Sequence, residues 1–232
     1  MKKKMEIPKV HLVSGNVPFE FAEAYKSLRT NFNFVAHNGE NKIILITSAI
    51  PNEGKSSVAI NLAISLVQTG KRVLLVDADL RNPSLHRYLT LKRERERGLS
   101  SILNGSVDMD ECIVESVLGF DVIVGGPIPP NPVELVGSAE MGKLLAAAQE
   151  SYDFVICDAP PVGVVTDAAD LSPLCDGVLF VVRQKATPKN QVMNAVARLK
   201  SVDAKILGVI MNHYDMADVP EKEYGYYSHY GK

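Results

Sequence analysis

The sequence lacks a hydrophobic segment long enough to cross a membrane. A transmembrane helix needs about 18 or more apolar residues in succession, and no part of the 232-residue chain approaches that length. The basic cluster at residues 1–5 is not followed by an apolar stretch, so we expect no signal peptide. The net charge of −2 shows no excess of basic residues, and we expect no nucleic-acid partner. These absences favour a cytoplasmic protein.

Cysteine is scarce as well. Cys112, Cys157 and Cys175 are odd in number and lack the spacing of a metal site, so we expect reduced thiols. A reductase built on a metal cluster is disfavoured for the same reason. Apolar residues make up 46% of the chain, which is enough for a sizeable core.

Short apolar segments alternate with longer amphipathic stretches. Six segments rich in β-branched residues read as buried strands of a parallel sheet, at residues 43–46, 73–76, 122–124, 154–156, 178–182 and 206–210. Helical spacing of apolar residues occurs at 57–70, 134–150 and 188–202. The alternation predicts an α/β fold, with a doubly wound, mostly parallel sheet flanked by helices.

We expect no internal domain boundary. Residues 1–212 are predicted to form one domain, in which residues 1–37 are a leading helical segment with a helix from Phe19. Residues 213–232 are predicted to form a C-terminal tail.

A phosphate-binding loop is indicated at residues 49–56, between the first expected strand and a helix. The segment matches the P-loop pattern GxxxxGK[ST], except that Ala49 replaces the first glycine. This is tolerable if the backbone there does not need a positive φ. Backbone amides of such a loop cradle phosphates, Lys55 reaches the outer phosphates, and the Ser56 hydroxyl ligates Mg²⁺. The other residues expected to bind nucleotide here are Pro51, Asn52, Glu53, Gly54 and Ser57.

Three aspartates follow two of the expected strands: Asp77, Asp79 and Asp158. Ligands of open α/β sheets bind at the carboxyl ends of strands, where all three would lie. A carboxylate there can hold Mg²⁺, directly or through water, or accept a proton from an attacking hydroxyl. Each aspartate alone could be an ordinary strand-end or capping residue. Their occurrence beside a P-loop favours a nucleotide site.

Tyrosine is concentrated near the end of the chain. Four of the eight tyrosines, Tyr224, Tyr226, Tyr227 and Tyr230, lie among glycine, serine and histidine. A packed core spaces aromatic residues along strands or helix faces, so this cluster favours an accessible tail with several phenolic hydroxyls.

Taken together, these motifs resemble those of the bacterial tyrosine kinases (BY-kinases) of capsule and exopolysaccharide synthesis. Residues 51–56 resemble the Walker A motif of that family, Asp-Ala-Asp-Leu-Arg at 77–81 matches its Walker A′ pattern DxDxR, and Asp-Ala-Pro-Pro at 158–161 resembles its Walker B motif. Residues 126–135 are similar to a loop typical of the family, and the tyrosine cluster is the expected tail. The resemblance covers nearly the whole chain.

The resemblance implies an ATP-dependent protein-tyrosine kinase that uses Mg²⁺ and phosphorylates its own tail tyrosines in trans. Lys55 and Ser56 would bind phosphate and metal, while Asp79 and Asp158 would organise the metal, largely through water. Asp77 would be the best candidate to accept the tyrosine proton, although its division of labour with Asp79 stays open.

Asn212, which closes the last expected strand, occupies the place where related P-loop ATPases often contact adenine. An asparagine that ends a strand before a turn is equally ordinary.

The resemblance also implies partners. The kinase would form a ring-shaped homo-oligomer, and a separate transmembrane activator protein would recruit it to the inner face of the membrane. A cognate tyrosine phosphatase would reverse its activity. In the leading helix, Glu23, Lys26 and Arg29 resemble the oligomer-interface motif ExxRxxR, with lysine in place of the first arginine. An exposed charged helix face would show the same spacing.

The main alternative is a positioning or partition ATPase of the ParA/MinD type that acts as a nucleotide switch. Those proteins carry a lysine just after the first P-loop position, where this chain has Ile50. They also have no reason to end in clustered tyrosines. A regulator of assembly with a vestigial ATP site is disfavoured, because the P-loop and all three aspartates are present.

Overall fold

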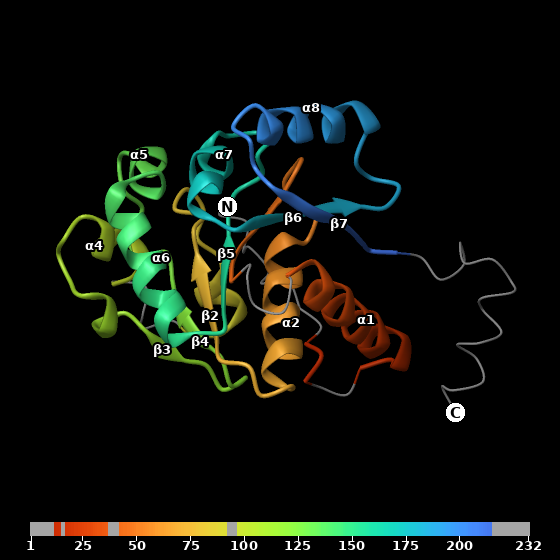
Figure 1. Ribbon diagram of the computed structural model, residues 1–232, viewed down its shortest axis with the longest axis horizontal. Coiled ribbons are helices and arrows are strands. Elements are labelled where there is room, and N and C mark those ends of the chain that lie inside the picture. The colour runs from red at the N-terminus through yellow and green to blue at the C-terminus, as the bar shows by residue number, and fades with distance from the viewer. Residues whose placement is uncertain (1–11, 15–16, 37–41, 92–96, 215–232) are drawn as a thin grey trace, which may run out of the picture.

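The computed structural model describes residues 12–14, 17–36, 42–91 and 97–214 (Figure 1). In these residues a seven-stranded sheet forms the centre of the molecule, with strand order β3-β4-β2-β5-β1-β6-β7. The strands are β1 (Ile43–Ser48), β2 (Val73–Asp77), β3 (Val114–Glu115), β4 (Asp121–Ile123), β5 (Phe154–Asp158), β6 (Gly177–Arg183) and β7 (Ile206–Asn212). All are parallel except β3, which pairs with β4 in the antiparallel sense.

Helices cover both faces of the sheet. They are α1 (Phe19–Val35), α2 (Lys55–Val67), α3 (Leu85–Tyr88), α4 (Leu99–Leu103), α5 (Pro132–Val136), α6 (Ala139–Ser151), α7 (Asp167–Leu171) and α8 (Lys189–Lys200), with 3-10 turns at Met109–Glu111 and Ser172–Leu174. Helices α1, α2 and α3 supply the core on one face, and α4 to α8 supply it on the other. No helix in the described ranges is long and apolar enough to span a membrane.

The central strands have two buried faces, which is why their sequences are apolar without interruption. Along β1, Ile43 and Leu45 pack into one core, while Ile44 and Ile46 pack into the other. Every residue of β1, β2 and β5 is buried. A strand covered by helices on both faces has no position for a polar side chain before its end.

The predicted α/β fold and all six predicted strands are confirmed. The two-residue β3 was not predicted, because so short a segment carries no periodicity. The single helix predicted at 134–150 is wrong. The chain instead forms α5 and α6, separated at Gly137 and Ser138, and the Ser138 hydroxyl caps α6 by accepting a hydrogen bond from the Met141 amide at 3.2 Å.

Helix α1, predicted from Phe19, packs on the same face as α2. Its Phe32 is 1% exposed and lies with its ring centroid 5.1 Å from that of Phe154 in β5. The Arg29 guanidinium donates to the Ser65 carbonyl oxygen in α2 at 2.8 Å. The leading helix therefore packs into the core, held by an aromatic contact with β5 and a hydrogen bond to α2.

Replacing Phe32 with alanine should lower the free energy of unfolding by about 3–5 kcal/mol, because a fully buried aromatic ring leaves a cavity. Phe34 in the same helix is 76% exposed. The matched Phe34→Ala variant should therefore change stability by no more than about 0.5 kcal/mol. Urea denaturation followed by circular dichroism measures both, and equal effects would show that α1 does not depend on the Phe32 contact.

Candidate functional site

The phosphate loop lies where β1 ends and α2 begins. Gly54, just before the first residue of α2, has φ +87°, and a Cβ there would come within 2.0 Å of the Asn212 side-chain nitrogen. Only glycine fits this position without displacing its neighbour. Ala49 is absent from the residues with positive φ, so the departure from the P-loop pattern at that position carries no backbone strain.

The first amides of α2 are available to a ligand. The earliest helical hydrogen bond runs from the Val58 amide to the Gly54 carbonyl at 2.9 Å, which leaves the preceding amides without partners inside the helix. A helix N-terminus of this kind favours anions. Ser56 lies in this first turn and is buried.

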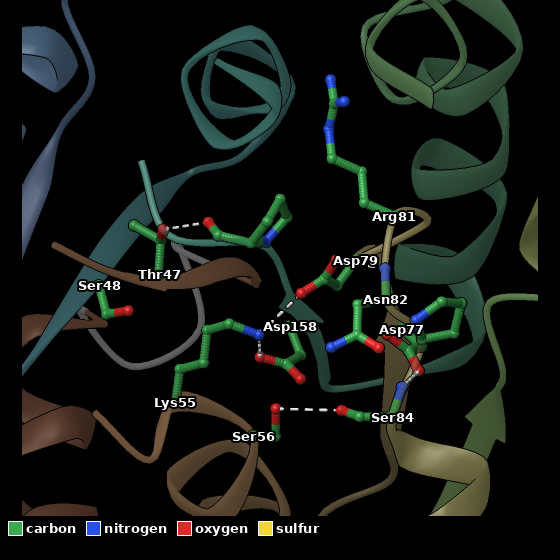
Figure 2. Close-up of polar contacts among 12 residues, drawn as sticks. Thr47, Ser48, Lys55, Ser56, Asp77, Asp79, Arg81, Asn82, Ser84 and Asp158 are labelled. Carbon is green, nitrogen blue, oxygen red and sulfur yellow. Dashed lines mark hydrogen bonds and ion pairs between the residues drawn. The ribbon is translucent and has the colours of Figure 1, made fainter. Parts of the chain in front are cut away.

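Lys55 lies among the predicted aspartates (Figure 2). Its Nζ is 3.2 Å from Asp79 Oδ2 and 3.5 Å from Asp158 Oδ1, and dashed lines mark both contacts in the figure. Burial lowers the pKa of Lys55, but the charges of Asp158, Asp79 and Asp77 together raise it above its ordinary value. Lys55 is therefore a permanent cation at the position where outer phosphates would be bound.

Asp77 is fully buried and is held by the start of α3. Its Oδ2 accepts hydrogen bonds from the Ser84 amide at 2.8 Å and the Leu85 amide at 2.9 Å. Burial and the charge of Asp158 raise the pKa of Asp77 to about 7, although the two amides and Lys55 oppose that rise. Asp77 and Asp158 are paired in register on neighbouring strands, which explains their repulsion.

The donor set fits a hydrated magnesium ion. Asp77 Oδ1 and Asp158 Oδ2 are buried and have no hydrogen-bond partner among the described residues. The Ser56 and Ser84 hydroxyl oxygens lie 3.4 Å apart beside them. In the described ranges no three His, Cys, Asp or Glu side chains converge to hold a metal alone. Mg²⁺ usually keeps several waters and takes its other ligands from hydroxyls and phosphates, which agrees with this arrangement.

Three residues that position the site carry no local signal in the sequence. Thr47 donates to the Pro160 carbonyl at 2.7 Å and accepts from the Val162 amide at 3.2 Å, so it joins β1 to the loop after Asp158. Asp167, buried at the start of α7, accepts from Arg81 Nε at 2.9 Å. Ser84 faces Ser56. Their partners lie far away in sequence, so no local pattern could have identified them.

Two predicted nucleotide ligands contact each other. Asn212 Nδ2 donates to the Glu53 carbonyl oxygen at 2.8 Å, and the Glu53 side chain is buried. Pro51 and Asn52 are exposed, and Ser57 is partly buried in the first turn of α2. The structure thus brings Asn212 to the phosphate loop, while its contact with a base stays a prediction.

The residues of the predicted interface motif make two different kinds of contact. Lys26 Nζ lies 2.6 Å from Glu23 Oε1 on the surface of α1. Arg29 instead contacts Ser65 of its own chain. The oligomer interface stays a prediction, and the four tail tyrosines lie outside the described residues.

The fold and the site define a nucleotide-binding α/β protein of the P-loop class. A family model described as an AAA domain matches residues 41–206. Tyrosine-protein kinase YwqD of Bacillus subtilis is 42% identical over 207 residues, which cover 89% of this chain and 86% of that protein. The kinase domain of the Escherichia coli tyrosine kinase ETK superimposes with a TM-score of 0.78 at 35% identity, over 85% of this chain and 79% of that one. The chain belongs to the family of bacterial tyrosine-protein kinases.

A longer relative shows the same kinase region within a larger protein. Tyrosine-protein kinase wzc of Salmonella typhimurium is 35% identical over 94% of this chain, which spans only 30% of that protein. The septum site-determining protein MinD of Pyrococcus horikoshii, solved with Mg-ADP, has 24% identity and a TM-score of 0.63 over 80% of this chain and 76% of that one. That likeness shows a shared fold alone, so the MinD-type alternative has only distant support.

Without nucleotide and Mg²⁺, Asp77 should make the protein less stable as pH rises. Its pKa is about 7 in the folded chain, so between about pH 4 and that value the folded chain holds a proton that the unfolded chain releases. The free energy of unfolding therefore falls across this interval. Asp77→Asn should remove the part of this pH dependence that is due to Asp77. Urea denaturation of both proteins in a chelating buffer, at about pH 5 and about pH 7.5, measures the difference. An identical pH dependence in the two proteins would contradict the assignment.

Proposed function

We propose that this kinase transfers the γ-phosphoryl group of ATP to tyrosines of its own tail: Tyr224, Tyr226, Tyr227 and Tyr230. The observation that carries the proposal is the arrangement of Lys55 with Asp79 and Asp158 at the phosphate loop. Family membership supports the reaction class, and the clustered tyrosines support the acceptor.

The chain's own groups supply most of the charge stabilisation. Amides at the start of α2 would hold phosphate oxygens, and the Lys55 ammonium would exchange its contacts with Asp79 and Asp158 for contacts with the outer phosphates. Ser56 would ligate Mg²⁺, with Asp79 and Asp158 acting through water, and the ion would add positive charge beside the transferred group. Freed from Lys55, the two carboxylates would be available to hydration waters of that ion.

Asp77 is our proposed acceptor of the phenolic proton. Without nucleotide the pKa of Asp77 is about 7, so its carboxylate is about half ionised at neutral pH and binds a proton well. Its Oδ1 lacks a partner among the described residues and has a free lone pair. Because the carboxylate is fully buried, this role requires that substrate entry uncover it. Asp79 would then keep its contact with the Asn82 amide, which donates to Asp79 Oδ1 at 3.0 Å.

The partners follow from the same family relationship. We propose a ring-shaped homo-oligomer in which the tail of one chain enters a neighbour's site. A separate transmembrane activator would recruit the kinase from the cytoplasm to the inner face of the membrane, and a cognate tyrosine phosphatase would remove the phosphate. Capsule or exopolysaccharide synthesis would be the process regulated.

Lys55→Met should lower phosphate incorporation into residues 224–230 by about 100-fold or more, because a charged donor to the transferred group is lost. The experiment incubates purified protein with ATP and Mg²⁺ and maps phosphate by mass spectrometry. Lys143→Met is a matched control, because Lys143 is exposed and pairs only loosely with Glu140 at 3.7 Å. Tail phosphate that is absent from the wild type, or unchanged in Lys55→Met, would refute the proposal.

Transfer between chains is tested by mixing two variants. A Lys55→Met chain should gain tail phosphate from an active chain in which all four tail tyrosines are phenylalanine. The first chain lacks the catalytic lysine and the second lacks acceptors, so phosphate can appear only by transfer in trans. A mixture without label, beside a labelled wild type, would show transfer within one chain.

A further inference from the structure

An acidic side chain is buried within the loop that should bind anionic phosphates. Glu53 is 1% exposed. Its Oε2 accepts a hydrogen bond from the Ile50 amide at 2.7 Å, and its Oε1 accepts from the Arg183 amide at 3.1 Å and from the Thr187 hydroxyl. A negative charge here opposes phosphate binding by simple electrostatics, so its presence needs another physical reason.

The chemistry of the partners supplies that reason. Two of the partners are backbone N–H groups, and the third is a hydroxyl that donates. An ionised carboxylate accepts at both oxygens and donates at neither, so it satisfies all three. The ion pairs between described residues do not include Glu53. Its side-chain interactions between described residues are thus hydrogen bonds, two of them to backbone amides and one to a hydroxyl.

The partners also come from separate parts of the fold. Ile50 belongs to the phosphate loop itself, Arg183 ends β6, and Thr187 lies in the turn before α8. The Glu53 carbonyl oxygen accepts from Asn212 at the end of β7. One residue therefore fastens the loop to the ends of two strands.

The backbone of the loop turns on both sides of Glu53. Asn52 has φ +65° and Gly54 has φ +87°, so left-handed residues flank Glu53 on both sides. Glycine adopts this region freely and asparagine more readily than other side chains, so the turn can form but needs surrounding contacts to keep it in one conformation. Glu53 lies between these two residues, and its hydrogen bonds hold the segment in place.

We propose that Glu53 is a positioning residue that holds the phosphate loop in its binding shape before nucleotide arrives. The inference rests on the proposed function in one respect, namely that this loop binds ATP. Glu53 acts through the backbone, since an ordered loop has less conformational freedom to lose when phosphates bind. Its charge is stabilised locally by hydrogen bonds from three donors.

The direction in which Glu53→Gln changes the Kd for ATP distinguishes a positioning role from an effect of charge. Glutamine has nearly the same size but presents an NH₂ group to one of the donors, so at least one partner loses its acceptor. If Glu53 acted only by its charge, neutralisation would tighten ATP binding. As a positioning residue, its replacement should raise the Kd for ATP by about 10-fold or more, measured by calorimetry with Mg²⁺ and a non-hydrolysable ATP analogue.

Two further variants serve as controls. Thr187→Val removes a single donor and leaves the backbone partners in place, so its Kd should rise by less than that of Glu53→Gln. Asp176→Asn changes a carboxylate at the opposite end of β1. Asp176 accepts hydrogen bonds from the backbone amides of Lys42 and Ile43, at 2.8 Å each. It should leave the Kd unchanged. Thermal denaturation confirms that each variant is folded.

Hydrogen exchange in the nucleotide-free protein tests the positioning directly. The amides of Ile50 and Arg183 should exchange faster in Glu53→Gln than in the wild type, with the central strands unaffected. An unchanged exchange rate at Ile50, or a Kd that is unchanged or lower in a folded Glu53→Gln protein, overturns the inference. A wild type that orders the loop but binds no ATP would instead refute the proposed function and leave the positioning role supported.

Discussion

The site is organised by one electrostatic imbalance. Three buried or nearly buried carboxylates surround a single lysine, so the nucleotide-free centre carries more negative than positive charge. A low-dielectric interior makes such an excess costly. Two effects reduce that cost at Asp77. Its raised pKa lets the carboxylate take up a proton, and two backbone amides donate to its Oδ2 when it is charged. A divalent cation would offset the negative charge that remains.

The strand order produces this imbalance. β5 lies between β2 and β1, so the aspartates at the ends of β2 and β5 meet the phosphate loop that follows β1. These strands are buried on both faces, and their first polar side chains occur where the sheet ends. The same constraint that makes their sequences uniformly apolar therefore places polar side chains at the strand ends, and the neighbouring carboxyl ends of β1, β2 and β5 bring those of the site together.

Much of this could be predicted from sequence, because each relevant signal was local. The apolar strands, the P-loop and Asp77, Asp79 and Asp158 were each readable within a few residues. The contacts of Thr47, Asp167 and Ser84 were not, since they depend on how distant segments pack. The break at Gly137 was missed because apolar spacing continues across it, and the inward turn of Arg29 was missed because helical spacing does not show which face is covered.

Helix α2 makes polar contacts near both of its ends. It begins at Lys55 in the centre of the site, and near its far end Ser65 accepts the hydrogen bond from Arg29 in α1. Ten residues of α-helix separate these positions, a length of about 15 Å at 1.5 Å per residue. One continuous helix therefore joins the contact with α1 to the first residue after the phosphate loop.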